Sequence, residues 1–131
     1  MLYLVDTSAL INILNGKSSF VELLGGIPLQ ACALSVITIG EVLEGVVEGS
    51  KKEDEARGIF SRFRVLDVDK KVCERFASVR RKLRQKGQLI DNMDLLIAST
   101  ALVHKLILIT GNKKHFERVK GLKLFTQDFA N

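Results

Sequence analysis

The chain has 131 residues and a formal net charge of +5, and 47% of its residues are hydrophobic. This length fits one domain, and the apolar content favours a packed core over intrinsic disorder. No apolar run approaches the roughly 20 residues of a membrane-spanning helix, and the N-terminus lacks the pattern of a signal peptide. We therefore expect a single cytoplasmic domain over residues 1–131, without membrane contact.

The first half of the chain alternates short apolar runs with amphipathic segments. Residues 2–5 predict a buried strand that ends at Asp6. Apolar side chains at helical spacing then predict a helix over residues 8–15. The elements expected next are a short helix over 20–24, a strand over 30–35 and a helix over 36–49.

The second half continues the alternation, and Asp69 is a good N-cap for its longest helix. The expected elements are helices over 52–63, 70–86 and 91–105, strands over 64–68, 106–110 and 122–125, and a short helix or turn over 112–119. Strands alternating with helices favour an α/β fold, a three-layer sandwich around a central, mostly parallel sheet.

Four side chains with oxygen ligands are expected at one edge of that sheet. The carboxyl ends of parallel strands share one edge, and binding sites of such folds form there. Asp6 and Asn112 follow strands, whereas Glu41 and Asp94 lie near the starts of helices. Clustered oxygen ligands without Cys or His match a hard cation, Mg²⁺ or Mn²⁺, which meets its substrate through phosphate groups.

Each of these residues also has an ordinary structural interpretation. Asp6 is a helix cap, Glu41 a solvated helix residue and Asn112 a turn former in that interpretation. Asp94 is more informative, because it precedes the apolar run 95–98, where desolvation of a carboxylate is costly without a partner. For Asp91 we predict helix capping first and a ligand role second.

Basic residues are concentrated between positions 70 and 86, a stretch that contains eight Lys and Arg residues and a single acid, Glu74. A solvated helix face is the simpler interpretation, and a contact with RNA is the alternative. An acidic site would need nearby positive charge to hold a nucleic acid. This stretch, which includes Arg81, and the basic residues 113, 114 and 118 would supply it.

The segments "LVDTSALI", "ITIGEVLEG", "DNMDLLIASTAL" and "LILITGNKKHFERVKGLKL" resemble, in order and spacing, the PIN-domain family. The similarity covers essentially the whole chain and is strongest to the VapC-type toxins of prokaryotic toxin–antitoxin pairs. It implies a PIN-like α/β fold, a metal-dependent ribonuclease that acts on RNA, a VapB-like antitoxin as partner, and a homodimer.

The resemblance also assigns roles to residues. Asp6, Glu41 and Asp94 match the family's acidic metal site for Mg²⁺ or Mn²⁺, and Asn112 falls where many members carry a fourth acid. These four are the predicted catalytic residues. The predicted substrate-binding residues are Ser8, Arg81 and Lys113.

Two other functions stay open at this point. One is a non-catalytic PIN-like module that binds RNA or a protein, which Asn112 in place of an acid keeps possible. The other is a phospho-acceptor receiver domain with Asp67 as acceptor, although the paired early acids of that class are missing.

Two further expectations concern packing. Cys32 and Cys73 are predicted to be reduced and to lie in or near the core, because both stand among apolar neighbours. Ile59, Phe60 and Phe63 either form an exposed patch for a dimer or an antitoxin or pack on the sheet.

Overall fold

The computed structural model describes residues 1–17, 22 and 25–125. The strands are β1 (Tyr3–Val5), β2 (Cys32–Ser35), β3 (Arg64–Leu66) and β4 (Ile107–Ile109). The helices are α1 (Thr7–Leu14), the 3₁₀ helix η1 (Leu29–Ala31), α3 (Val36–Glu44), α4 (Lys51–Phe60), α5 (Lys70–Gln85), α6 (Asn92–His104) and α7 (Lys113–Phe116). Within these described ranges, each helix is too short or too polar to cross a membrane.

The four strands form one parallel sheet in the order β3-β2-β1-β4. Strand β1 is central, and Leu4 pairs with Ala33 of β2 on one side and with Leu108 of β4 on the other. Because all strands run the same way, the residues that follow β1 and β4 leave the sheet at the same edge. This topology brings Asp6 next to the 110–112 segment, and the backbone N–H of Asp6 donates to the carbonyl of Ile109 (3.0 Å).

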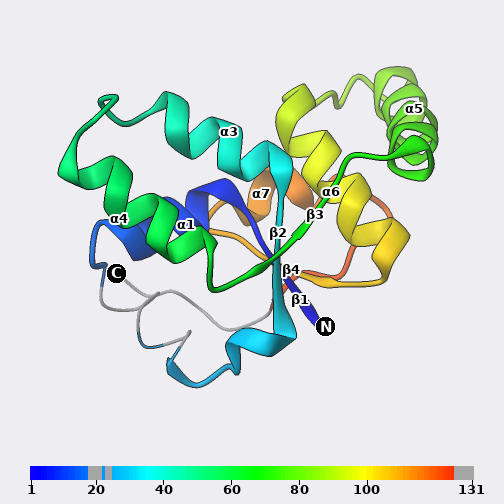
Figure 1. Ribbon diagram of the computed structural model, residues 1–131. Coiled ribbons are helices and arrows are strands. Elements are labelled where there is room, and N and C mark those ends of the chain that lie inside the picture. The colour runs from blue at the N-terminus through cyan, green and yellow to red at the C-terminus, as the bar shows by residue number, and fades with distance from the viewer. Residues whose placement is uncertain (18–21, 23–24, 126–131) are drawn as a thin grey trace.

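Both faces of the sheet are buried, and successive strand residues serve different cores. Leu4 and Leu108 point into a core shared with α5 and α6, whereas Val5 and Ile109 point into a core shared with α1, α3 and α4. Figure 1 shows α5 and α6 on one side of the sheet and α1, α3 and α4 on the other. The predicted α/β fold with a parallel sheet between helical layers is confirmed.

Side-chain caps fix the starts of α1, α3 and α5, which follow strands, and of α6, which follows α5. Asp6 caps α1, Ser35 caps α3 and Asp91 caps α6, each by accepting hydrogen bonds from the first-turn backbone N–H groups. The predicted cap of α5 is present as well, because Asp69 Oδ1 accepts from the backbone N–H of Val72 (3.0 Å). Short polar side chains therefore stand where the sheet ends and helices begin.

Some predicted elements differ in extent. The helix expected over 36–49 ends at Glu44, because the chain turns at Gly45 and a new cap, Ser50, starts α4. The strand expected over 122–125 contributes one bridge, between Leu108 and Leu124, within the described residues. Of the helix expected over 20–24, only residue 22 is described, and the rest lies outside the described residues.

The structure decides between two packing alternatives and contradicts one packing prediction. Phe60 and Phe63 are each 8% exposed and pack with Ile59 in the core on the α1 side of the sheet, so they form no surface patch. Cys32 is buried, as predicted, but Cys73 is exposed on α5. Helical periodicity located the buried stripe of α5 correctly and left Cys73 outside it.

Leu83 tests the packing of α5 against the core that it shares with α6. It is 3% exposed, so Leu83→Ala is expected to lower the free energy of unfolding by about 2–5 kcal/mol through lost burial and a residual cavity. Leu89→Ala, at a side chain that is 40% exposed, is the matched control and is expected to change it by about 0.5 kcal/mol or less. Urea denaturation of both variants makes the comparison, and equal losses would contradict the assigned packing.

Candidate active site

Asp6 is a buried carboxylate at the end of the central strand. It is 2% exposed, and its Oδ1 accepts hydrogen bonds from the backbone N–H of Ala9 (2.9 Å) and the hydroxyl of Ser8 (2.9 Å). Burial raises the pKa of Asp6 from 3.8 to about 6, although hydrogen bonds from Thr110, Ala9 and Ser8 oppose the rise. The negative charge of Asp94 raises the pKa of Asp6 further, so the two carboxylates lie close enough to repel each other.

Asp94 lies in the first turn of α6, and its side chain is 25% exposed. Burial raises its pKa, and the negative charges of Asp91 and Glu41 raise it further, while His115 works in the opposite direction. The pKa of Asp94 therefore responds to acids from two helices, and the pKa of Asp6 responds to Asp94. Of the predicted residues, Asp94 thus interacts electrostatically with both Asp6 and Glu41.

Glu41 is held on α3 by a hydroxyl chain that reaches across to α1. The hydroxyl of Thr7 lies 2.6 Å from Glu41 Oε1 and donates to it, and the Thr7 and Thr38 hydroxyls are 3.1 Å apart. Thr38 is completely buried, so it fixes Thr7 from the core side. The sequence predicted Glu41, but the position of its carboxylate depends on this contact between helices.

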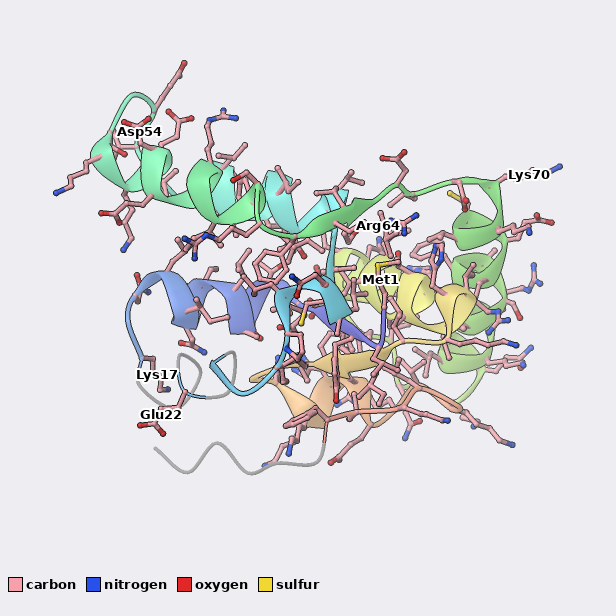
Figure 2. All side chains as sticks on the ribbon, turned by 60° about the horizontal axis from the view of Figure 1, so that its bottom comes forward. Met1, Lys17, Glu22, Asp54, Arg64 and Lys70 are labelled. Carbon is pink, nitrogen blue, oxygen red and sulfur yellow. The ribbon has the colours of Figure 1, made fainter. Side chains whose placement is uncertain are left out.

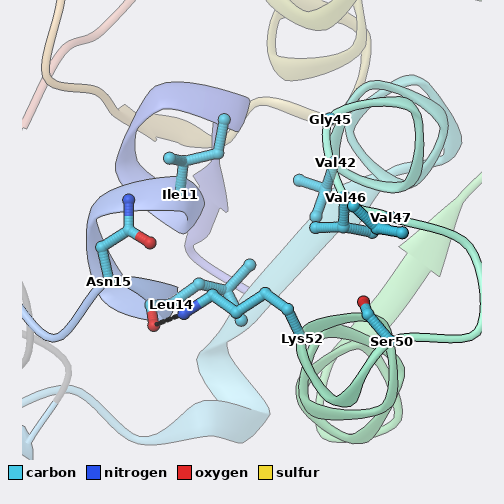
Figure 3. A pocket seen from close by; sticks show the side chains of 9 residues that line it. All are labelled: Ile11, Leu14, Asn15, Val42, Gly45, Val46, Val47, Ser50 and Lys52. Atoms are coloured by element: carbon cyan, nitrogen blue, oxygen red, sulfur yellow. Dashed lines mark hydrogen bonds between the residues drawn. The ribbon is translucent and has the colours of Figure 1, made fainter.

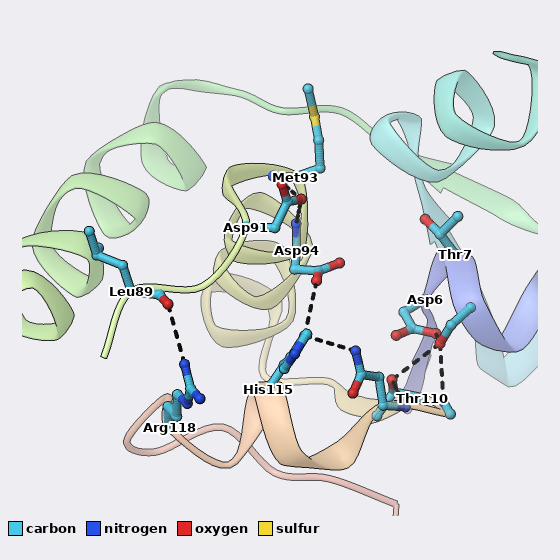
Figure 4. Close-up of polar contacts among 12 residues, drawn as sticks. Asp6, Thr7, Leu89, Asp91, Met93, Asp94, Thr110, His115 and Arg118 are labelled. Carbon is cyan, nitrogen blue, oxygen red and sulfur yellow. Dashed lines mark hydrogen bonds and ion pairs between the residues drawn. The ribbon is translucent and has the colours of Figure 1, made fainter. Parts of the chain in front are cut away.

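Asn112 lies just beyond β4, where its backbone N–H donates to the Thr110 hydroxyl (2.9 Å). Its side-chain amide donates to Nδ1 of His115 (2.8 Å), and the same ring nitrogen lies 3.8 Å from Asp94 Oδ2. Figure 4 shows His115 between Asp94 and the β4 end of the site. His115 was not among the residues predicted from the sequence, although its position three residues after Asn112, at the start of a helix, is a usable signal.

The remaining predicted residues have different surroundings. Asp91 caps α6 by accepting from the backbone N–H groups of Met93 and Asp94, as predicted, and its ligand role stays a prediction. The Ser8 hydroxyl joins the two strand ends, because it donates to Asp6 and accepts from the backbone N–H of Gly111 (3.1 Å).

The predicted cationic substrate contacts lie on different helices. Lys113 is the first residue of α7 and is half-buried, whereas Arg81 is exposed on α5. Asp67, the alternative phospho-acceptor, is exposed beyond β3, the edge strand two positions away from β1. Asp67 therefore follows a different strand from Asp6, which follows β1, and from Asn112, which follows β4.

The donor set fits a small hard cation that keeps part of its hydration shell. In the part of the chain that the structure describes, no three Asp, Glu, His or Cys side chains are close enough together to hold an ion directly. One carboxylate oxygen of Glu41 accepts a hydrogen bond from Thr7, and His115 lies beside Asp94. Mg²⁺ is commonly bound through one or two carboxylates, with waters and substrate phosphates completing its octahedron. The desolvated oxygens of Asp6 and Asp94 match that requirement.

Two adjoining hollows lie on the α1 side, and the first of them borders the acidic site at Glu41. One, of about 630 Å³, is lined by residues of α1 and α3 together with Met93, and it includes Thr7 and Glu41. The other, of about 410 Å³, lies between α1, α3 and α4 and shares Ile11 and Gly45 with the first. Figure 3 shows Lys52 crossing this second hollow to donate to the carbonyl of Leu14 (2.8 Å). The acidic site therefore opens onto a largely apolar groove.

The raised pKa of Asp6 predicts how stability changes with pH. Between pH 3.8 and about 6 the folded state holds a proton that the unfolded state has lost, so the free energy of unfolding falls as pH rises through this window. The shift corresponds to about 3 kcal/mol. Asp6→Asn keeps an oxygen to accept the capping hydrogen bonds and cannot ionise.

Urea denaturation in EDTA between pH 4 and pH 7.5 measures this effect. The stability of Asp6→Asn relative to the unsubstituted protein is expected to increase with pH and then to level off above the pKa of Asp6. Titration of Asp94 and other groups occurs in both proteins and largely cancels in the difference. A difference that stays constant with pH would show that Asp6 is not desolvated.

The sequence and the fold both match known proteins. The PIN domain model matches residues 3–122. Ribonuclease VapC1 of Methanocaldococcus jannaschii is 40% identical over 125 residues, which cover 93% of this chain and 85% of that protein.

Two solved structures show the same fold. The VapBC2 complex of Rickettsia felis, crystallised with a DNA fragment from its promoter, aligns with a TM-score of 0.84 and 33% identity over 98% of this chain and 100% of that one. A toxin–antitoxin complex from Klebsiella pneumoniae aligns with a TM-score of 0.77 and 30% identity over 92% and 94% of the two chains. With its parallel sheet, its acidic site at the strand ends and a family match over most of its length, the chain belongs to the PIN-domain family.

Proposed function

We propose that this protein is an endoribonuclease that hydrolyses phosphodiester bonds of RNA, and that it is the toxin of a VapBC-type toxin–antitoxin pair. The naming of its relatives as VapC ribonucleases supports the reaction class. The solved VapBC assemblies of the same fold support the toxin role. The observation that carries the proposal is the pair of desolvated, mutually repelling carboxylates, Asp6 and Asp94, at the edge of the sheet.

We propose that the site uses Mg²⁺ or Mn²⁺. Keeping two carboxylates partly or wholly out of water beside each other costs stability, and a divalent cation offsets both the burial and the repulsion. When bound, such a cation supplies counter-charge for phosphate oxygens and activates a water molecule for hydrolysis. Asp6 and Asp94 are proposed to hold it directly, and Glu41 through its hydration shell.

The other site residues have roles that follow from their contacts. Thr7 orients Glu41 by donating to Oε1, which directs the other carboxylate oxygen toward water or substrate. Asn112 is proposed to contact substrate, with His115 fixing its amide group. Ser8, Lys113 and Arg81 remain the proposed substrate contacts.

A VapB-like antitoxin is the proposed protein partner. Exposed apolar side chains border the groove beside the acidic site, among them Ile11 (40% exposed), Met93 (45%) and Val47 (75%). A chain segment with apolar side chains would cover them and reach Glu41 at the same time. The homodimer implied by the family resemblance also stays a prediction, and it does not involve Phe60 or Phe63, because both are buried.

The proposed reaction is tested by incubating the protein with a mixed RNA pool in Mg²⁺ or Mn²⁺ and in EDTA. Cleavage is expected only with the metal, and Asp6→Asn or Asp94→Asn is expected to slow it by about a hundredfold or more. Asp67→Asn is the matched control, since it removes an exposed carboxylate beyond the edge strand. Gel electrophoresis of the RNA measures the rates.

Two results would count against the enzyme. Metal-independent cleavage that survives Asp6→Asn would point to a contaminating nuclease. RNA binding without cleavage, unchanged by Asp6→Asn, would favour the non-catalytic PIN-like module instead.

Metal binding by the free protein is tested separately by thermal denaturation. Mg²⁺ or Mn²⁺ at about a hundredfold excess over its dissociation constant stabilises a folded protein by about 2.7 kcal/mol. The melting temperature of the unsubstituted protein is expected to rise by several degrees, and that of Asp6→Asn by much less. Equal rises in both proteins would mean that the metal acts elsewhere on the chain.

A further inference from the structure

Helix α5 carries an unusual excess of positive charge on its exposed surface. Eight basic residues lie on it or at its C-cap: Lys70, Lys71, Arg75, Arg80, Arg81, Lys82, Arg84 and Lys86. Arg80 is half-buried and bonded to Asn92, and the other seven are exposed. Within the described ranges 1–17, 22 and 25–125, no carboxylate forms an ion pair with any of the eight.

Helix α4 shows what an ordinary charged helix of this protein looks like. It carries three acids and three bases, and Lys52–Glu55 and Arg57–Glu53 form ion pairs along its surface. On α5 the only acid is Glu74, so neighbouring bases repel one another at four-residue spacing, as Lys71 and Arg75 do. A solvated surface needs no such arrangement, whereas a polyanion bound along the helix would turn the repulsion into attraction.

The basic residues of α5 are also ordered along its axis. Lys71, Arg75, Lys82 and Lys86 follow at intervals of four, seven and four residues. With 100° per residue they fall within an arc of about 60° and span about 22 Å of helix length. The buried stripe formed by Val72 and Leu83 lies beside this row and holds the helix against the sheet layer. The charges therefore stand on a rigid support.

A polar hollow at the start of this row is large enough for a phosphate group. It measures about 420 Å³ and is lined by Lys71, Glu74, Arg75 and Ser78 of α5 and by Val103 of α6. Two cationic side chains and a hydroxyl are suitable phosphate ligands. No aromatic side chain of α5 is exposed, since Phe76 packs against the core, so the helix offers contacts for a backbone and none for stacked bases.

The basic helix is tied to the acidic site at its C-terminal end. Arg80 Nε donates to Asn92 Oδ1 (3.0 Å) at the start of α6, two residues before Asp94. The loop between α5 and α6 is held from the other side, because Arg118 donates to the carbonyl of Leu89 (3.3 Å), as Figure 4 shows. The C-terminal half of α5 therefore lies beside the start of α6, which carries Asp94.

We propose that the row Lys71, Arg75, Lys82 and Lys86 binds the phosphate backbone of a folded RNA, away from the bond that is cut. This rests on the proposed ribonuclease function and narrows its substrate class. A folded RNA presents phosphates at the carboxylates and along α5 simultaneously, whereas a short single strand reaches only the carboxylates. Recognition along α5 is independent of base sequence.

The test compares two triple variants with the same change in charge. Lys71→Gln, Arg75→Gln and Lys82→Gln together lower the net charge from +5 to +2, and so do Lys51→Gln, Arg62→Gln and Arg64→Gln. The control residues are exposed on or beside α4 and β3, and they form no ion pair within the described ranges. Figure 2 shows α4, marked by Asp54, and α5, marked by Lys70, on opposite sides of the molecule.

Binding of an unfractionated transfer RNA pool is measured in EDTA at increasing salt concentrations. The α5 triple variant is expected to bind about tenfold more weakly or worse, and its slope of log K against log salt is expected to be smaller by about 2–3. With metal present, cleavage of the transfer RNA pool should fall in parallel, while cleavage of a short single-stranded oligonucleotide stays unchanged. The control triple variant should match the unsubstituted protein.

Glu74→Gln provides a second test that does not depend on the folding of the triple variant. Removal of the only acid on α5 is expected to tighten RNA binding and leave oligonucleotide cleavage unchanged. Equal salt slopes for the two triple variants would overturn the proposal. It would also be overturned if the α5 triple variant bound an acidic protein more weakly but bound transfer RNA as tightly as the unsubstituted protein does. If no RNA is cleaved under any condition, the ribonuclease proposal fails, whereas the binding slopes in EDTA still decide the role of α5.

Discussion

The burial of Asp6 is the constraint on which the rest of the site depends. Strand β1 is covered on both faces, so the residue that ends it cannot reach bulk water, and the same residue must cap α1. One carboxylate oxygen accepts the capping bonds, and desolvation raises the pKa of the group to about 6. A charge in this position is stable only with a compensating partner, and this need gives the strand end its chemical character.

The surroundings of Asp6 raise the free energy cost of ionising it. At a purely structural position, neighbouring groups would be expected to lower that cost. Asp94 and Glu41 add negative charge, and the nearby hydroxyl groups of Thr7 and Ser8 orient carboxylates without neutralising them. The His115 ring lies beside Asp94, with Nδ1 3.8 Å from Asp94 Oδ2, and the same nitrogen accepts from the Asn112 amide. Clustering these acids lowers the stability of the fold, while the positive charge that a polyanionic substrate needs is placed separately on α5.

Local patterns predicted much of this fold because caps and periodicity act over a few residues. Asp69 and Asp91 cap the helices they were expected to cap, and the stripe of α5 faces the core. The predictions that were left open or differ in extent concern features that depend on a neighbouring element. Phe60 ends α4 and Phe63 lies in the turn before β3, so their burial depends on how α4 packs against the core, and the extent of pairing at Leu124 depends on β4.

The sequence by itself determined the strand and helix types, the caps and the candidates Asp6, Glu41, Asp94 and Asn112, because hydrophobic spacing and cap chemistry are local properties. Only the tertiary structure decided which side chains meet. His115 joins Asp94 and Asn112, and Thr7 holds Glu41, because the sheet order brings β4 beside β1 and packing brings α1 against α3. Desolvation and mutual repulsion of carboxylates depend on distances through space, which the order of residues along a chain does not specify.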